Sequence, residues 1–295
     1  MSEQGTQSQL PKGFTVGHWT DEEGRTGCTV VVAPDGAVGG VDVRGGAPAT
    51  LGSDALRPGT ALERAHAVLL TGGSAFGLDA AGGIMRYLEE RGVGFVLGPV
   101  RVPVVVGAVI FDLLVGDSKA RPNGNAGYAA CQAATREPGS GAVGAGTGAT
   151  VAKAGDGSQA RPGGVGIASA KADRATVAAV VVANSVGGIW DDERRDWVAP
   201  LSEWDRASDL LPGANTTLAV VMTDAQLTKE QTNRVATVAH DGIARAVRPA
   251  HTMFDGDTVF CLATGAVGAP YDAVEVVAAD VVSRAIVVGV RAAQP

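Results

Sequence analysis

The chain has 295 residues, of which 45% are hydrophobic and 19% are charged, and its formal net charge is −7. This balance predicts a globular protein with one large core or two modest domains. Nucleic acid is not expected as a partner, because phosphate binding requires a clustered basic face and the densest basic pair, Arg194-Arg195, lies among acidic residues.

Glycine is abundant, at 42 residues, and aromatic residues make up only 4%. This composition predicts a core of valine and alanine with tight turns and close approaches of the backbone. The cysteines are odd in number and widely spaced, and the histidines show no ligand spacing. We therefore expect no disulfide framework and no metal site, and a structural or solvated role for each histidine. These residues are Cys28, Cys131, Cys261, His18, His66, His240 and His251.

No targeting or membrane segment is expected. Residues Met1 to Lys12 are polar and lack the apolar core of a secretion signal. The apolar run from Val102 to Val115 is too short to span a membrane and contains Asp112. The sequence therefore predicts a cytoplasmic protein.

The first half of the chain mixes apolar runs with two helical patterns. A Pro34-Asp35-Gly36 turn is expected to join the first two strands, and the strands after the first helix are expected to be buried on both faces. The first helix is expected to end at Arg91-Gly92, which supplies a C-cap glycine. The predicted strands are Cys28–Ala33, Val38–Val43, Ala65–Leu70, Val93–Leu97 and Val104–Leu114, and the helices lie after Ser74 and over Ala126–Thr135.

The second half continues this mixture on either side of a charged segment. Residues Asp191 to Asp209, with Trp190, Trp197 and Trp204, form the one linker-like stretch inside the chain. Thr228 and Gln231 form a capping box at the start of a helix. The other expected elements are strands at Val165–Ala170, Thr176–Ala183, Leu218–Met222 and Asp257–Ala263, and a helix over Pro270–Val288. Strands and helices without strict alternation favour a layered α/β sandwich over a barrel.

The segment Asn215-Thr-Thr217 permits a specific chemistry. A threonine at the start of a strand, behind a charged linker, lies where a chain can be cut without dismantling its core. Cutting before Thr216 would give that residue a free α-amine, whose reference pKa of ~7.7–8.0 suits a general base for its own hydroxyl. The alternative is that these residues are only a turn entering a strand.

Three further elements could serve the same chemistry, and each has a plainer alternative. Lys153 follows a turn rich in glycine and threonine and is either a local cation or a surface lysine. Asn184 ends a buried strand, where its amide can donate to an oxyanion or cap a turn. Asp255 and Asp257 are one residue apart, so both carboxylates can reach one ammonium, or they belong to a solvated turn.

Together these residues resemble the self-processing L-aminopeptidase/D-esterase family of N-terminal-nucleophile hydrolases. Within it, Asn-Thr at the junction and Asp-Gly-Asp resemble the branch that hydrolyses 6-aminohexanoate oligomers of nylon, whereas the aminopeptidase branch typically has Gly-Ser at the junction. The likeness runs from about residue 17 to residue 288. It is carried by Leu70-Thr-Gly-Gly-Ser-Ala-Phe-Gly-Leu-Asp79, Gly144-Ala-Gly-Thr-Gly-Ala-Thr-Val-Ala-Lys153, Val182-Ala-Asn184, Asn215-Thr-Thr-Leu-Ala-Val-Val221 and Phe254-Asp-Gly-Asp-Thr258.

The resemblance implies an α/β fold, a four-layer α/β/β/α sandwich, formed by residues 1–295 as a single catalytic domain. It also implies autocatalytic cleavage into 1–215 and 216–295, a homo-oligomer (dimer or tetramer), and no metal or organic cofactor. The expected partner is a small-molecule or oligoamide substrate.

The family's site residues carry over by position. Thr216 matches the nucleophile, Lys153 the active-site lysine and Asn184 the asparagine beside the oxyanion. Asp255 and Asp257 match the acidic pair that holds the nucleophile. Where some members place a tyrosine near the oxyanion this chain has Phe111, so that hydroxyl is missing or Tyr128 supplies it. An aminopeptidase, an ornithine acetyltransferase-like acyl transferase and a non-catalytic relative are the alternative functions.

Overall fold

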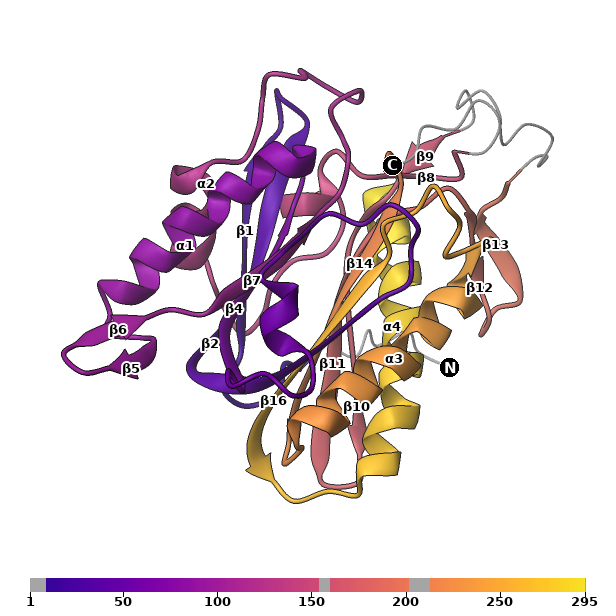
Figure 1. Cartoon of the computed structure of the whole chain (residues 1–295). Helices are drawn as coiled ribbons and strands as arrows, with labels where there is room; N and C mark the ends of the chain where they lie inside the picture. The colour runs from indigo at the N-terminus through magenta and orange to yellow at the C-terminus, as the bar shows by residue number, and fades with distance from the viewer. Residues whose placement is uncertain (1–8, 154–159, 202–212, 295) are drawn as a thin grey trace.

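A mixed sheet of nine strands dominates residues 9–153, 160–201 and 213–294, the parts of the chain that the computed structural model describes (Figure 1). Its strand order is β10-β11-β14-β16-β2-β4-β7-β3, and β1 pairs with β2. The strands are β1 (Thr15–Asp21), β2 (Thr26–Val43), β3 (Thr50–Leu51), β4 (Arg64–Thr71), β7 (Val105–Val109), β10 (Gly164–Ala172), β11 (Ala175–Asn184), β14 (Thr216–Ala225) and β16 (Thr258–Val267).

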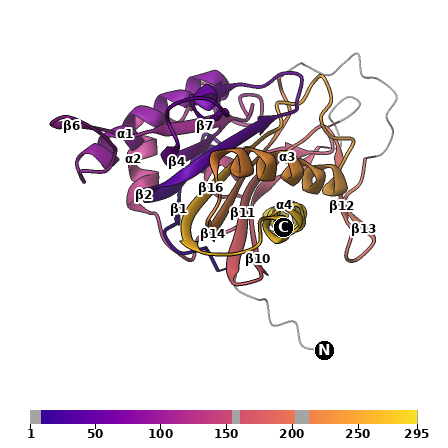
Figure 2. The same ribbon diagram turned by 60° about the horizontal axis from the view of Figure 1, so that its bottom comes forward.

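Helices cover the two outer faces, and short elements join the layers (Figures 1 and 2). The helices are α1 (Ala80–Glu89), α2 (Gly124–Gln132), α3 (Lys229–Ala246) and α4 (Tyr271–Ala293). The short strands are β5 (Phe95–Leu97), β6 (Val100–Val102), β8 (Thr150–Val151), β9 (Arg161–Pro162), β12 (Gly188–Asp191), β13 (Asp196–Ala199) and β15 (Val247–Arg248), and the 3-10 helices are Ser53–Leu56, Ser74–Asp79 and Gly144–Gly146.

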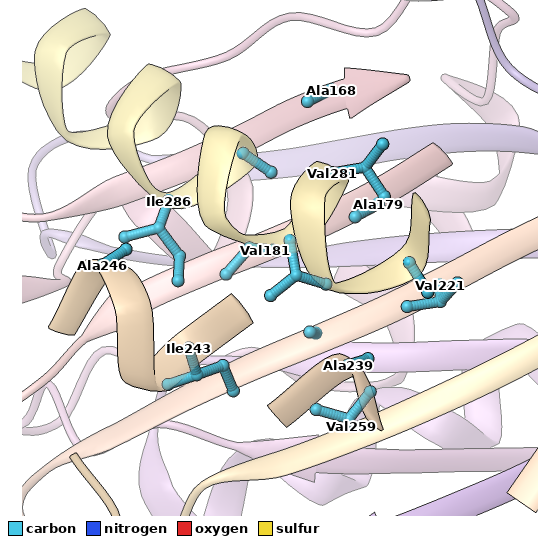
Figure 3. Close-up of a cluster of buried hydrophobic side chains, with 14 of the residues drawn as sticks. Ala168, Ala179, Val181, Val221, Ala239, Ile243, Ala246, Val259, Val281 and Ile286 are labelled. Carbon is cyan, nitrogen blue, oxygen red and sulfur yellow. The ribbon is translucent and has the colours of Figure 1, made fainter. Parts of the chain in front are cut away.

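Three separate clusters of buried side chains define a four-layer α/β/β/α sandwich. One lies between the helix pair α3/α4 and strands β10, β11, β14 and β16 (Figure 3). The second lies between those strands and the half of the sheet formed by β2, β4 and β7. The third lies between that half and the helix pair α1/α2. The fold class expected from the family resemblance is confirmed.

Strand β14 shows why the central strands of the sheet have continuous apolar sequences. Leu218, Val220 and Met222 face the core between the two halves of the sheet. Ala219 and Val221 alternate with them and face α3 and α4. A strand that is buried on both faces has no solvent-facing positions for polar residues.

Glycine permits the close packing of α4 on the sheet. A Cβ at Gly166 would overlap the carbonyl oxygen of Ala285, and a Cβ at Gly289 would overlap the backbone of Gly166. The expectation that the many glycines serve close backbone approaches is confirmed at this contact.

Strand β2 differs from the predicted hairpin. Residues 26–43 form one strand with an irregularity between Val32 and Ala37, so the Pro34-Asp35-Gly36 segment does not reverse the chain. The first part of β2 pairs with β1 and the last part with β16, while both parts pair with β4. One strand thereby joins the two halves of the sheet.

The prediction of buried strands at 93–97 and 104–114 is wrong in two places. Phe95 and Val96 are about half exposed, because β5 pairs with β6 in a two-stranded hairpin that extends from the body (Figure 1). Only Val105–Val109 of the second run is a strand, and Leu114 beyond it is 75% exposed. Apolar composition alone could not tell these exposed positions from the core.

The charged stretch that sequence patterns mark as a linker is partly structured. Its first residues contain β13 and the end of β12, which form a small sheet with β15 from outside the stretch. Residues 202–212, which include Trp204, lie outside the described residues. In the described part of the chain no helix is both long and apolar enough to cross a membrane.

Candidate active site

The candidate residues meet at one end of three adjacent strands. Antiparallel pairing of β11 with β14 places Asn184 opposite Thr216. Parallel pairing of β14 with β16 brings the turn before β16 beside the start of β14, and Asn215 forms a bridge with Asp255. The structure therefore brings together all the residues that the sequence proposes for the site.

Thr216 lies against the peptide bond that precedes it. The Thr216 hydroxyl donates to the carbonyl oxygen of Asn215, in the peptide bond that joins these two residues. The same carbonyl oxygen accepts from Gly256 N at 2.8 Å. Thr216 is only 3% exposed, so hydroxyl and carbonyl meet where little water competes.

Lys153 follows β8 and is held by backbone pairing with the turn after β11. Lys153 N donates to Val186 O at 2.9 Å. Its ammonium donates to three oxygens: the backbone and side-chain oxygens of Asn184, both at 3.0 Å, and the carbonyl of Ala214 at 3.1 Å. Burial lowers the pKa of Lys153 to about 7, against the opposing effect of the negative charges of Asp255 and Asp112.

Asn184 is fully buried, and its amide orientation follows from its partners. Oδ1 accepts from Lys153 Nζ and from Thr150 N, each at 3.0 Å, so the other end of the amide carries the N–H groups. Those donate to the carbonyls of Phe111, at 3.3 Å, and Ala214, at 3.5 Å. Asn184 and Lys153 therefore share the carbonyl one residue before Asn215.

Asp257 holds the backbone just after the Asn215–Thr216 bond, and the Asp255 carboxylate holds the turn before β16. Asp257 Oδ1 accepts from Thr217 N at 2.6 Å. Asp255 accepts from Thr252 N at 2.9 Å and from Thr252 Oγ1 at 2.6 Å. Burial, and then the charge of Asp257, raise the pKa of Asp255. In the uncut chain Thr216 has no free amine, and the contact that Asp257 makes is with the next residue.

Two groups near the site were missed by sequence reasoning. Asp112 accepts from Thr26 Oγ1 at 2.6 Å and from Gly73 N at 2.7 Å, and burial raises its pKa while the charge of Lys153 lowers it. His251 contacts Asp257 through Nδ1 at 2.7 Å. A lone carboxylate inside an apolar run was a signal for Asp112, but the sequence pattern of His251 gave none.

The two candidates for the missing hydroxyl lie in different places. The backbone carbonyl of Phe111 is in the site, where it accepts from Asn184. The Tyr128 hydroxyl instead donates to Glu90 Oε2 at 2.7 Å, and its ring packs edge-on against Tyr87 in the α1/α2 layer. Tyr128 therefore does not supply a hydroxyl to this site in the uncut chain.

The arrangement places a hydroxyl and one N–H group at the Asn215 carbonyl. It places the Lys153 ammonium and the Asn184 amide at the Ala214 carbonyl, one residue earlier. The Thr216 hydroxyl could attack the Asn215 carbonyl, and Gly256 N–H could stabilise the resulting oxyanion. Within the described residues no three His, Cys, Asp or Glu side chains gather closely enough to hold a metal ion.

Comparison with known proteins places this chain among peptidases. The sequence profile of Peptidase family S58 matches residues 12–295. An uncharacterized aminopeptidase of Mycobacterium leprae is 45% identical over 91% of this chain and 83% of its own length. A 6-aminohexanoate-oligomer endohydrolase of Kocuria sp. is 32% identical over 88% of this chain and 75% of its own length.

Solved structures share the fold. A Burkholderia sp. beta-aminopeptidase superposes with a TM-score of 0.69 at 25% identity, over 95% of this chain and 84% of its own. The L-aminopeptidase D-Ala-esterase/amidase of Ochrobactrum anthropi, described as a variant of the Ntn hydrolase fold, gives a TM-score of 0.74 at 20% identity, over 98% of this chain and 88% of its own.

Proposed function

Because the chain belongs to peptidase family S58, we propose that it is an amide hydrolase that cuts its own backbone between Asn215 and Thr216 and then uses Thr216 as an N-terminal nucleophile. The observation that carries the proposal is the contact of the Thr216 hydroxyl with the Asn215 carbonyl, whose oxygen also accepts from Gly256 N. A nucleophile held beside its target in this way needs little further ordering to react.

The first reaction is an acyl shift followed by hydrolysis. Thr216 Oγ1 attacks the Asn215 carbonyl carbon, the C–N bond breaks, and the hydroxyl proton ends on the Thr216 nitrogen. Water then hydrolyses the ester, which leaves a carboxylate on Asn215 and restores the Thr216 hydroxyl. Gly256 N–H stabilises the oxyanion, and loss of one such donor typically costs ~10²–10³ in rate.

The second reaction uses the freed amine. With a reference pKa of ~7.7–8.0, the Thr216 amine accepts the proton of its own hydroxyl while Oγ1 attacks a substrate amide. The leaving amine departs with that proton, and water hydrolyses the acyl ester. Asn184 donates to the oxyanion, and the ammonium of Lys153 favours the neutral form of the Thr216 amine.

Linear 6-aminohexanoate oligomers are the proposed substrate class. This choice is supported by the Asn-Thr junction, the Asp-Gly-Asp turn and the 32% identity to the Kocuria endohydrolase. An aminopeptidase is the second candidate, favoured by the 45% identity to relatives that carry that name. An acyl transferase remains a third alternative, and it would convert acetyl-ornithine.

Self-cleavage is tested by the intact mass of the purified protein. The wild-type chain of 29.6 kDa should give two pieces, 1–215 and 216–295, whose summed mass exceeds that of the chain by one water. Thr216→Val keeps the shape but lacks the hydroxyl, and it should stay whole. Thr217→Val is the matched control, because the Thr217 hydroxyl has no partner among the described residues, and it should be cut normally. Cleavage of Thr216→Val at the normal rate would disprove the mechanism.

Substrate choice is tested by a side-by-side assay, followed by mass spectrometry at equal enzyme concentration. Linear 6-aminohexanoate oligomers should be cut into shorter amino-terminated oligomers faster than aminoacyl amides release free amino acids. Rapid turnover of L- or D-aminoacyl amides with intact oligomers would favour the aminopeptidase, and turnover of acetyl-ornithine alone would favour the acyl transferase.

A further inference from the structure

His251 supplies two donors to one carboxylate oxygen of the site. Its backbone N donates to Asp257 Oδ2 at 3.0 Å, and its ring Nδ1 lies 2.7 Å from the same atom. A carboxylate only accepts hydrogen bonds, so Nδ1 carries the proton in this contact. Among the described residues, no other side chain has a recorded contact with this oxygen.

The other oxygen of Asp257 holds the strand at the cleavage point. Oδ1 accepts from Thr217 N at 2.6 Å, one residue after the proposed nucleophile. Asp257 is 1% exposed, so water does not replace these partners readily. Any rotation of the carboxylate would therefore move the backbone that carries Thr216.

His251 is itself fixed by its surroundings. Its φ of 57° lies in the left-handed region, which residues other than glycine adopt rarely and often at functional sites. Its ring packs edge-on against His240, with the centroids 4.8 Å apart. His240 is fully buried on α3, and its Nε2 contacts the carbonyl oxygen of Asp42 at 3.1 Å. A continuous set of contacts thus runs from β2 through α3 to Asp257.

We infer that His251 is a positioning residue for self-cleavage: by fixing Asp257, it holds Thr217 N, and so aligns the Thr216 hydroxyl with the Asn215 carbonyl. The inference rests on the proposed function. His251 touches neither the scissile bond nor the nucleophile, and its effect passes through Asp257. A histidine that only packed under α3 would influence stability but not the rate at which folded protein cuts itself.

Two substitutions separate these roles. His251→Gly removes the ring and its donor but suits the left-handed backbone, while His251→Asn tolerates that backbone and offers an amide N–H to Asp257. His66→Asn is the matched control, because His66 is a buried histidine on β4 that contacts Val104 N and has no recorded contact with the site residues. Freshly translated whole chains are followed by mass to obtain the first-order rate of self-cleavage, and melting temperatures are measured on each.

We expect His251→Gly to slow self-cleavage about tenfold or more, since small misplacements of reacting groups have effects of this size. His251→Asn should recover most of the rate, and His66→Asn should cleave at the wild-type rate whatever its melting temperature. Wild-type cleavage by His251→Gly, or equal slowing in the Gly and Asn variants, would overturn the inference. If the wild-type chain stays whole, the proposed function itself fails, which is visible before any variant is compared.

Discussion

Lys153 and Lys229 use the same device in two regions of the molecule. Each places an ammonium group among backbone carbonyls. Lys229, the first residue of α3, donates to carbonyls at positions 55, 60 and 62 and to the Thr60 hydroxyl, in a 3-10 helix and the loop that follows it. Lys153 donates to Asn184 at the end of β11 and to Ala214, next to the proposed cleavage point.

The difference lies in what the acceptors belong to. The contacts of Lys229 tie a loop to a helix terminus, and within the described parts of the chain no carboxylate contacts its ammonium. The acceptors of Lys153 lie on two segments that meet at Thr216, and the charges of Asp255 and Asp112 act on the same ammonium. A buried lysine is therefore a structural clamp in one place and a candidate for chemistry in the other, and the identity of its partners decides which.

The largest expected effect is the loss of self-cleavage in Lys153→Met. Removal of the ammonium leaves the Ala214 and Asn184 carbonyls without their cation, so the cleavage rate should fall by about 10²-fold or more. The rate is measured by mass on freshly translated chain. Lys229→Met is the matched control and should cleave within about twofold of wild type. An equal fall in the cleavage rate of the two variants would show that Lys153 has no role in self-cleavage that Lys229 lacks.

The next effect concerns stability. Lys229→Met removes the buried ammonium that joins α3 to the carbonyls of residues 55–62. Those acceptor residues are half-buried or exposed, so water can replace part of the lost donors, and the free energy of unfolding should fall by about 1–2 kcal/mol. Urea denaturation of the variant and of wild type, both in the uncut Thr216→Val background, measures the difference. An unchanged midpoint would show that Lys229 does not stabilise the loop.

The pH dependence sharpens the comparison further. Below pH about 7 the Lys153 ammonium has one N–H for each of its three acceptors, and above it the amine has only two. The rate of self-cleavage, measured by mass across this pH range, should therefore fall as the pH rises through about 7. The same fall in rate should be absent in Lys153→Met.

Stability should respond to Lys153 in the opposite direction. Burial lowers its pKa in the folded chain, so between about 7 and the ordinary value of 10.5 the unfolded chain binds more protons. The contribution of Lys153 to stability then rises with pH across that window. Cleavage that slows while the protein becomes no less stable would exclude unfolding as its cause.

The smallest effect is expected for Tyr128→Phe. The lost hydrogen bond to Glu90 lies at the exposed edge of the α1/α2 layer, so the free energy of unfolding should change by less than about 1 kcal/mol. Self-cleavage should be unchanged in the same mass assay. Slower self-cleavage of Tyr128→Phe would show that Tyr128 contributes to the active site after all.

Local patterns predicted much of this molecule. The Thr228–Gln231 capping box is present at the start of α3, and β10 and β11 cover the strands expected at Val165–Ala170 and Thr176–Ala183. Asn184 and Thr216 were identified because each stands where an apolar run meets polar residues. Such boundaries are visible in sequence, since they reflect the end of a buried strand.

Contacts between distant segments were not predictable in this way. Asp112 reaches Thr26 across 86 positions, and His251 meets His240 only because α3 packs beside the turn before β16. The prediction of a buried strand at Phe95–Leu97 was wrong for the same reason. Whether an apolar strand finds a covering layer depends on the packing of the whole fold, which one run of residues does not encode.

The place of β14 inside the sheet has a consequence for how the protein could be reassembled. It lies between β11 and β16, so a cut before Thr216 leaves the two pieces interleaved across the central layers. The pieces could not part without exposing the two clusters of buried side chains that β14 borders, and a cleaved protein would remain one particle. Once denatured, the cleaved protein would have to refold by association of two chains, and the rate of that refolding would depend on protein concentration. Cleavage would thus make folding a one-time event whose product is protected by the slowness of its unfolding rather than by its ability to refold.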